Sequence, residues 1–321
     1  MIVVTGAAGF IGSCILAKLN SLGHKDVIIV DHIGNELKRK NFENKKYIKY
    51  YDKLEFLKLL SQGKFNGQVD CIIHMGACSS TTLQDADYFK RNNLDYTRTL
   101  AQWALENHAR FIYASSAATY GDGADGYKDD DATIRKCKPL NLYGQSKQDF
   151  DLWVLNNNLS EKFVGLKFFN VFGPNEYHKD DMRSVIAKAY QRVTEEGKMS
   201  LFRSYRPDYK DGEQKRDFIY VKDVVDVVMF FFANPKVHGI FNVGTGEART
   251  WVDLANALFS AVKKKTNLEF MDMPESLRPR YQYFTQADMG KLRKAGYQKS
   301  FTPLEESIKD YVAYLRTGSY I

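Results

Sequence analysis

The sequence predicts an α/β protein, with a doubly wound parallel sheet and a smaller C-terminal α/β domain. One observation is the apolar run 2–4, which leads into Gly6, Gly9 and Gly12 and then into apolar residues at helical spacing. This pattern indicates a strand, a tight turn and a helix. A second observation is that strand-like and helix-like segments alternate along the chain, which is typical of a parallel sheet with helices on both faces.

The glycine turn predicts a cradle for a pyrophosphate. Gly6 permits the tight turn, Gly9 lets the backbone approach the phosphates, and Gly12 lets the helix pack closely on the strand. A second apolar run, 27–30, ends at Asp31, where a Rossmann fold places an acid against the adenosine ribose. A glycine triplet alone is more often an ordinary turn, but strand, glycines, helix, strand and acid in this order predict dinucleotide binding.

The alternation continues through the chain. Strands are expected at 47–51, 69–74, 110–115 and 163–169, and helices are expected at 54–60 and about 85–107. The dinucleotide-binding Rossmann domain should comprise residues 1–172, rejoined by a strand, a helix and a strand within about 213–246. The substrate-binding domain should comprise residues 173–321, chiefly the segments 173–210 and 248–321. Ligands of such sheets bind beyond the carboxyl ends of strands, so the residues that follow each strand are the candidates for chemistry.

The composition is that of a protein with a full hydrophobic core, since 44% of its 321 residues are hydrophobic and 26% are charged. No membrane span is expected, because the longest apolar stretches contain a charge or are too short. Met1 directly precedes the first expected strand, so we expect no signal peptide and a cytoplasmic location. The four cysteines lack metal-ligand spacing, so no metal is expected and the thiols should stay reduced.

The net charge of +7 is modest for a chain of this length. Basic residues are dispersed except at Lys38-Arg39-Lys40, whereas nucleic-acid binding requires a clustered stripe. An anionic small-molecule ligand would account for the excess, and so would an ordinary solvated surface. We therefore expect neither a nucleic-acid partner nor a membrane partner.

Tyr143 and Lys147 are four residues apart, which places them on one face of a helix. A phenol has a pKa of about 10, so it acts as a base near neutral pH only where a neighbour such as an ammonium lowers that pKa. Ser115 and Ser116 lie at the end of the strand expected at 110–115, and a serine hydroxyl close by can hydrogen-bond a substrate oxygen. In a chain with 20 tyrosines this spacing also arises by chance, so the pair alone is only a hypothesis.

Three motifs together carry a resemblance to a known family. They are Thr-Gly-x-x-Gly-x-x-Gly at 5–12, Ala-Ser-Ser-Ala-Ala-Thr-Tyr-Gly at 114–121 and Tyr-x-x-x-Lys at 143–147. The chain resembles the extended short-chain dehydrogenase/reductase superfamily of nucleotide-sugar epimerases and dehydratases. Three further stretches are similar to one branch, the heptose epimerases: Gly-Ala-Cys-Ser-Ser-Thr-Thr at 76–82, the pair His178-Lys179, and Tyr-Gln-x-Phe-Thr-Gln-Ala-Asp at 281–288.

The resemblance implies an isomerase that uses NADP to invert carbon 6 of ADP-D-glycero-D-manno-heptose through a 6-keto intermediate, for the inner core of lipopolysaccharide. It also implies a homo-oligomer, specifically a homopentamer. One alternative is another nucleotide-sugar epimerase or dehydratase, such as a UDP-sugar 4-epimerase. The dehydratase is disfavoured because no acid pair follows Ser116 to Thr119. A second alternative, a catalytically silent dinucleotide sensor, is disfavoured because Ser116, Tyr143 and Lys147 are all present.

The resemblance also implies roles for individual residues. Tyr143 and Lys179 match the two acid/bases, Lys147 matches the lysine that orients the nicotinamide ribose and lowers the tyrosine pKa, and Ser116 matches the helper hydroxyl. The positions that match cofactor contacts are Gly6, Gly9, Phe10, Ile11, Gly12, Asp31, His32, Lys38, Lys53, Met75, Gly76, Ala77, Cys78, Ser79, Asn92, Tyr143, Lys147, Val171 and Lys179. Those that match substrate contacts are Ser116, Asn170, Asp181, Lys188, Phe202, Arg203, Ser204, Tyr205, Arg216 and Tyr281. Asp181, Lys188 and Arg203 depart from the residues that are common in this branch.

The choice between NADP and NAD depends on the end of the second strand. Asp31 favours the free 2′-hydroxyl of NAD, since a carboxylate repels a phosphate. His32, Lys38 and Lys53 match positions that contact NADP in the heptose epimerases, and the basic triplet at 38–40 can neutralise the extra charge. The triplet is also compatible with an ordinary solvated loop. The resemblance favours NADP, with NAD as the alternative.

Overall fold

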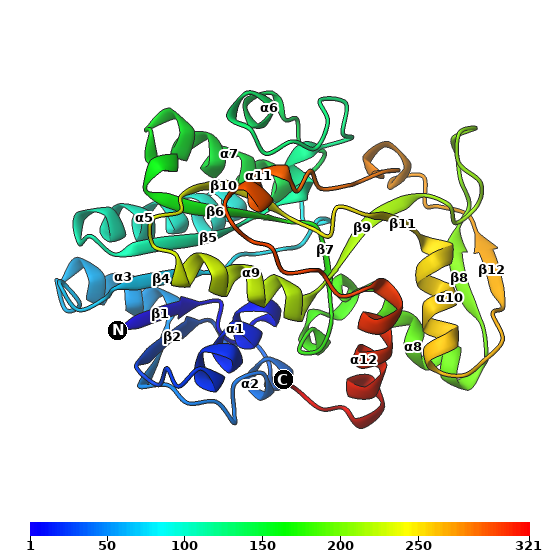
Figure 1. The fold of residues 1–321 in the computed structure, drawn as a ribbon, viewed down its shortest axis with the longest axis horizontal. Helices are drawn as coiled ribbons and strands as arrows, with labels where there is room; N and C mark the ends of the chain where they lie inside the picture. The colour runs from blue at the N-terminus through cyan, green and yellow to red at the C-terminus, as the bar shows by residue number, and fades with distance from the viewer.

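A seven-stranded parallel sheet forms the larger part of the molecule. The computed structural model describes residues 1–321. The strand order is β10-β6-β5-β4-β1-β2-β3, and every neighbouring pair is parallel (Figure 1). The strands are β1 (Ile2–Thr5), β2 (Val27–Asp31), β3 (Lys49–Asp52), β4 (Cys71–His74), β5 (Arg110–Ser116), β6 (Phe163–Phe168) and β10 (Gly239–Val243). The order reverses after β3, so the predicted doubly wound sheet is confirmed.

Helices cover both faces of this sheet. Successive side chains of a strand point to opposite faces, so the apolar residues of each strand are divided between two cores. Ile2 and Val4 of β1 belong to the core beneath α1 (Phe10–Ser21) and α9 (Val221–Ala233). Val3, between them, belongs to a second core. The helices over this second core are α3 (Lys53–Ser61), α5 (Tyr96–Glu106) and α7 (Leu142–Asn156). The sheet is therefore apolar on both faces, as a parallel sheet between two helix layers must be.

Two smaller sheets lie beyond one end of the large sheet (Figure 1). In one of them the order is β11-β9-β7, with β7 (Asn170–Phe172), β9 (Lys215–Tyr220) and β11 (Ala248–Thr250). The other pairs β8 (Met199–Phe202) with β12 (Leu268–Met271). The segment at about 213–246 was expected to rejoin the large sheet with two strands. Only its second strand, β10, does so, because β9 pairs with β7 and β11 instead.

The remaining helices are short, apart from three in the C-terminal half. Those three are α8 (Val185–Glu195), α10 (Trp251–Ala261) and α12 (Leu304–Thr317). None of the helices is long and apolar enough to cross a membrane. The short ones are α2 (Glu36–Lys40), α4 (Ala86–Phe89), the π-helix η1 (Lys90–Asp95), η2 (Ala117–Tyr120), α6 (Asp131–Lys136), η3 (Leu159–Glu161), η4 (Tyr177–Met182), η5 (Arg278–Arg280) and α11 (Gly290–Lys294).

The segment 85–107, expected to be a single α-helix, contains a π-helical turn. The turn η1 separates α4 from α5 and contains Asn93, which is buried. The Asn93 side chain accepts from the Cys78 amide at 2.8 Å and donates to the Cys78 carbonyl at 2.9 Å and to the Ser146 hydroxyl at 3.0 Å. Cys78 and Ser146 lie far from Asn93 in the sequence, so helical periodicity could not reveal these contacts. They join the loop after β4 to helix α7.

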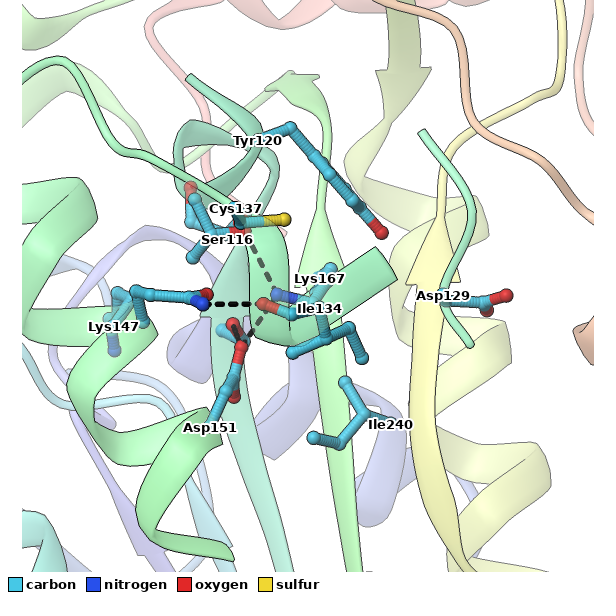
Figure 2. A network of polar contacts seen from close by, with 12 residues as sticks. Ser116, Tyr120, Asp129, Ile134, Cys137, Lys147, Asp151, Lys167 and Ile240 are labelled. Atoms are coloured by element: carbon cyan, nitrogen blue, oxygen red, sulfur yellow. Dashed lines mark hydrogen bonds and ion pairs between the residues drawn. The ribbon is translucent and has the colours of Figure 1, made fainter. Parts of the chain in front are cut away.

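A buried ion pair fixes α7 against the sheet. Lys167 of β6 and Asp151 of α7 lie 2.6 Å apart, and both side chains are fully shielded from solvent. Asp151 also accepts from Tyr113 at 2.9 Å and Ser115 at 2.6 Å on β5. Lys167 also donates to Thr119 at 2.9 Å. Figure 2 shows the two charged groups pointing toward one another from neighbouring elements. Because every charge has a partner, the desolvation of this pair is compensated.

Removing one charge of the pair should destabilise the fold. Lys167→Met is expected to lower the free energy of unfolding by about 3–5 kcal/mol, since it leaves a buried carboxylate without its cation. Adding Asp151→Asn should recover part of this loss, because the double variant no longer holds the unpaired Asp151 carboxylate. The recovery should be incomplete, because Lys147 also loses the negative charge of Asp151. Urea unfolding followed by circular dichroism measures both values.

The matched control is Lys198→Met, whose partner Glu269 lies 2.9 Å away in a half-exposed pair. Its loss should stay below about 1 kcal/mol. Equal losses for Lys167→Met and Lys198→Met, or strict additivity in the double variant, would contradict the importance of the buried pair.

Candidate active site

A cavity of about 520 Å³ opens at the carboxyl ends of the parallel strands. Its lining comes from the glycine turn after β1, the end of β2, the loop after β4, the end of β5, the start of α7 and the loop that contains η4. These segments are far apart in the sequence, but a parallel sheet brings the ends of its strands to one edge. The cavity is therefore where the fold places the candidate site.

The glycine turn forms a close-packed cradle at one wall. A Cβ atom on Gly12 would lie 2.1 Å from the carbonyl oxygen of Gly6, and one on Gly6, whose φ is +67°, would lie 2.6 Å from the amide nitrogen of Gly76. No side chain caps the N-terminus of α1, and its first turn contains no acid. The free amides and the positive end of the helix dipole therefore suit a pyrophosphate.

Asp31 lies beside this turn, and both of its carboxylate oxygens accept hydrogen bonds. One carboxylate oxygen accepts from the Ala8 amide at 2.8 Å, and the other accepts from the His32 amide at 2.7 Å and from the ammonium of Lys38. Lys38 also donates to the His32 carbonyl at 2.6 Å. A positive charge thus lies directly on Asp31. Because Lys38 offsets the carboxylate, the repulsion that Asp31 alone would exert on a phosphate is reduced.

Tyr143, Lys147 and Ser116 also line the cavity. Asn141 caps α7 through the Gly144 amide at 2.8 Å, which sets where the helix begins. Burial raises the pKa of the Tyr143 phenol, and a hydrogen bond with Ser116 opposes this rise. Burial lowers the pKa of Lys147 to about 8, and the charge of Asp151 opposes this fall. The Lys147 ammonium donates to the Ala114 carbonyl at 2.7 Å, so its position is fixed by β5.

Lys179 lies in η4, which also lines the cavity. Its ammonium lies 5.4 Å from the centre of the Phe10 ring. Burial lowers the pKa of Lys179, and the charge of Glu176 opposes this change. Glu176 is 1% exposed and accepts from the Ser184 hydroxyl at 2.6 Å and from Tyr311 at 2.9 Å. A lysine with a lowered pKa can exchange a proton closer to neutral pH than an exposed one.

Most of the expected cofactor residues line this cavity. Of that set, Lys53, Cys78 and Asn92 do not. Lys53 is hydrogen-bonded to Asn92 instead, and the backbone of Cys78 is held by Asn93. Among the expected substrate residues, only Ser116 is part of the lining.

Several of the other expected substrate residues form a second group around β8 and β9. The guanidinium of Arg216 lies 5.0 Å from the centre of the Tyr281 ring, and the Tyr281 hydroxyl accepts from Trp251 at 2.9 Å. The rings of Phe202 and Tyr281 are 6.4 Å apart. The guanidinium of Arg278 lies over the Tyr205 ring, 3.8 Å from its centre. Stacked aromatic rings and cations of this kind can hold a flat, anionic ligand.

The other expected substrate residues lie apart from both groups or at their edges. Asn170 begins β7, directly after the residues at the end of β6 that line the cavity. The Lys188 ammonium donates to the Asp181 carbonyl at 3.2 Å. Arg203 is paired with Asp211 at 3.4 Å, and the Ser204 amide donates to the same carboxylate at 2.8 Å.

Sequence reasoning missed several residues of the lining. They are Gly34, Asn35, Ala114, Ser115, Phe168, Phe169, His178, Asp180 and Met182. His178 had one usable signal, its place beside Lys179. Asp180 has a φ of +44°, a strained conformation that turns the chain within η4, and the sequence gives no sign of it.

Comparison with known proteins agrees with this geometry. ADP-L-glycero-D-manno-heptose-6-epimerase of Nitratidesulfovibrio vulgaris (strain ATCC 29579 / DSM 644 / CCUG 34227 / NCIMB 8303 / VKM B-1760 / Hildenborough) is 53% identical to this chain over 312 residues, with 97% of each chain covered. The protein of the same name from Fusobacterium nucleatum subsp. nucleatum is 46% identical over 321 aligned positions, again with 97% of each covered. These relatives match nearly the full length of this chain.

Solved structures share the fold. The crystal structure of Helicobacter pylori ADP-L-glycero-D-manno-heptose-6-epimerase matches with a TM-score of 0.82 and 27% identity, covering 98% of this chain and 96% of its own. UDP-N-acetylglucosamine 4-epimerase from Methanobrevibacter ruminantium has a TM-score of 0.84 at 23% identity, covering 99% and 98%. The model of the NAD dependent epimerase/dehydratase family matches residues 2–244. Because that match runs from β1 to the end of β10 and so spans the whole large sheet, this chain belongs to the NAD dependent epimerase/dehydratase family.

Proposed function

We propose that this chain is a cytoplasmic epimerase that interconverts ADP-D-glycero-D-manno-heptose and ADP-L-glycero-D-manno-heptose, with NADP as its cofactor, for the heptose of the lipopolysaccharide inner core. The observation that carries the proposal is that Tyr143, Lys147, Ser116 and Lys179 line one cavity together with the glycine cradle. The names of the relatives, at 53% and 46% identity, support the same substrate. The resemblance supports assembly as a homo-oligomer, with five copies.

The residues present fit a pyridine nucleotide. The uncapped N-terminus of α1 and the glycine turn would hold the pyrophosphate, and the end of β2 would hold the adenosine ribose. The nicotinamide supplies a reversible acceptor for the hydride of carbon 6. Lys147, fixed by the Ala114 carbonyl, would hold the second ribose.

Two side chains are proposed to move the proton of the carbon 6 hydroxyl. Tyr143 would take this proton in its phenolate form as the substrate is oxidised to its ketone. Burial disfavours that phenolate, whereas the hydrogen bond with Ser116 favours it, and so would the ammonium of Lys147 one helical turn away. The ketone then turns in the cavity, so its oxygen moves away from Tyr143. Lys179 returns a proton to that oxygen as the ketone is reduced on its opposite face. Inversion needs both groups, because one side chain cannot reach within about 3 Å of the oxygen in both positions.

The second group of residues is proposed to hold the ADP part of the substrate. Arg216 and Tyr281 offer a cation and an aromatic face, and Phe202 lies at the edge of the same ring. Residues 173–210 and 248–321 would then form the substrate part of the molecule. Residues 1–172, with the segment at about 213–246, would form the cofactor part.

The substrate assignment is tested with candidate nucleotide sugars. The purified protein should convert ADP-D-glycero-D-manno-heptose into its carbon 6 epimer, and it should leave UDP- and dTDP-hexoses unchanged. Nuclear magnetic resonance of the sugar protons distinguishes the two stereoisomers. Epimerisation of a UDP-hexose at carbon 4 with no action on the ADP-heptose would overturn the assignment.

The two-base mechanism predicts large effects of conservative substitutions. Tyr143→Phe and Lys179→Met should each lower the rate of epimerisation by about a hundredfold or more, because each removes one acid/base. Lys162→Met, on an exposed lysine outside the cavity, should have no effect. The rate is measured from the appearance of the second epimer. A parent-like rate for Lys179→Met would show that Lys179 is only a loop lysine.

The proposed preference for NADP predicts which nucleotide the purified protein carries and how a substitution of Lys38 changes nucleotide affinity. Denaturing the purified protein should release NADP, because an epimerase that reuses its hydride has no need to exchange the cofactor. Lys38→Met should weaken NADP binding about tenfold or more relative to NAD binding, since it removes a cation and exposes the charge of Asp31. Calorimetric titration measures both affinities. Release of NAD alone, with no binding of NADP, would refute the preference.

A further inference from the structure

The loop that carries Lys179 runs from Gly173 to Ser184, and one buried carboxylate joins its two ends. Glu176 accepts from the Ser184 amide at 2.5 Å and from the Ser184 hydroxyl at 2.6 Å. It also accepts from the Gly173 amide in a longer contact of 3.4 Å. Three consecutive residues of this loop, 178–180, line the cavity. The carboxylate therefore closes the segment that presents Lys179 to the site.

The backbone around Lys179 is fixed by the same residue. The Lys179 amide donates to the Glu176 carbonyl oxygen at 3.1 Å, so a tight turn joins the two residues. At the other end of the loop, the Ser184 hydroxyl accepts from the Ala187 amide at 3.2 Å and caps α8. Glu176 thus connects the turn at Lys179 to the beginning of a regular helix.

A further contact ties the loop to helix α12. Tyr311 of this helix is completely buried, and its hydroxyl donates to the Glu176 carboxylate at 2.9 Å. Burial raises the pKa of Tyr311 and so does the charge of Glu176, so the hydroxyl keeps its proton and remains a donor. Neither Glu176 nor Tyr311 lines the cavity. Any effect of either residue on the reaction must therefore pass through the loop.

Hydrogen bonds, and no ion pair, hold the charge of Glu176. A buried carboxylate is costly unless donors surround it, and hydrogen bonds to a charged group are stronger than neutral ones. Glu176 receives them from both ends of the loop and from α12, so a displaced loop would leave the carboxylate partly unsatisfied. Lys179 is the cation whose charge interacts with it. These contacts favour a single position of the loop.

We propose that Glu176 and Tyr311 are positioning residues for the proton transfer by Lys179, with Glu176 closing the loop and Tyr311 fixing the closed loop on α12. The inference rests on the proposed two-base function. Proton transfer requires Lys179 within about 3 Å of the substrate oxygen, so a small displacement of the loop lowers the rate. Tyr143 is held on α7 by other contacts, so the proton transfer that it performs should not depend on Glu176 or Tyr311.

The first experiment separates turnover from binding. Glu176→Gln keeps the shape of the side chain but removes its charge, and it should lower kcat about tenfold or more. Tyr311→Phe removes one hydrogen bond and should lower kcat about threefold to tenfold. KM for the ADP-heptose should stay within about threefold of the parent in both variants, because neither residue lines the cavity. A parent-like kcat in both variants would overturn the inference.

The matched control is Tyr220→Phe. The Tyr220 hydroxyl also donates to a carboxylate of α12, that of Asp310, at 2.5 Å. Asp310 keeps Lys222 as a partner, at 2.7 Å, when this hydroxyl is removed. The substitution therefore removes the same kind of hydrogen bond from the same helix without touching the loop. Its kcat should equal that of the parent, and a loss as large as that of Tyr311→Phe would overturn the role given to Tyr311.

The second experiment distinguishes a positioning role from a merely structural one. Each pure epimer is mixed with the protein that carries NADP, and formation of NADPH is followed by stopped-flow absorbance. In the two-base mechanism one epimer gives its proton to Tyr143 and the other gives it to Lys179, and Lys179→Met identifies the second. Glu176→Gln should slow oxidation of that second epimer about tenfold and leave oxidation of the first within about twofold.

Equal slowing of both epimers would overturn the inference, because a general weakening of the fold is not selective. If Glu176→Gln fails to fold, Tyr311→Phe gives the same comparison, since Glu176 keeps both of its contacts with Ser184 in that variant. A parent protein that oxidises neither epimer, or a Lys179→Met variant that oxidises both at the parent rate, would instead refute the proposed function. The two failures are therefore distinguishable.

Discussion

The contact on which the candidate site depends most is the buried ion pair between Lys167 and Asp151. Neither charge can reach water, so the two must remain together for the fold to persist. The pair therefore fixes both the height and the rotation of α7 above β5 and β6. Asp151, Lys147 and Tyr143 follow one another at intervals of four residues, so they share one face of this helix. Because the ion pair holds Asp151 on the sheet, it also sets where the Lys147 ammonium and the Tyr143 phenol lie at the edge of the sheet.

The loop that contains Lys179 is also held by a buried carboxylate. Glu176 is buried and holds Ser184 and Tyr311, so it ties the loop of Lys179 to the N-terminus of α8 and to α12. Each lysine of the site thus has a buried carboxylate close by, Asp151 for Lys147 and Glu176 for Lys179. In both cases burial lowers the lysine pKa and the carboxylate opposes it. In both cases the nearby carboxylate means that the buried amine is not an isolated charge in the interior.

The sequence was informative where function depends on local spacing and strand order. The glycine turn, Asp31, Ser116 and the Tyr143–Lys147 spacing were found because each is a local pattern, and parallel strands bring such patterns to one edge. The π-turn around Asn93 was missed because its cause is a set of contacts with Cys78 and Ser146. The pairing of β9 with β7 was missed for a similar reason, since a strand pattern does not name its neighbour.

The arrangement of the smaller sheet bears on how an inverting reaction can be specific. Phe168 at the end of β6 lines the cavity, β7 begins two residues later at Asn170, and β7 pairs with β9, which carries Arg216. The cavity and the group around Tyr281 are thus connected by hydrogen-bonded strands rather than by loops. In the proposed reaction the ADP part would be held by a rigid element while the ketone turns. The freedom needed for inversion would then come from rotation within the substrate, with the protein as a fixed frame that offers one proton-transfer group on each side.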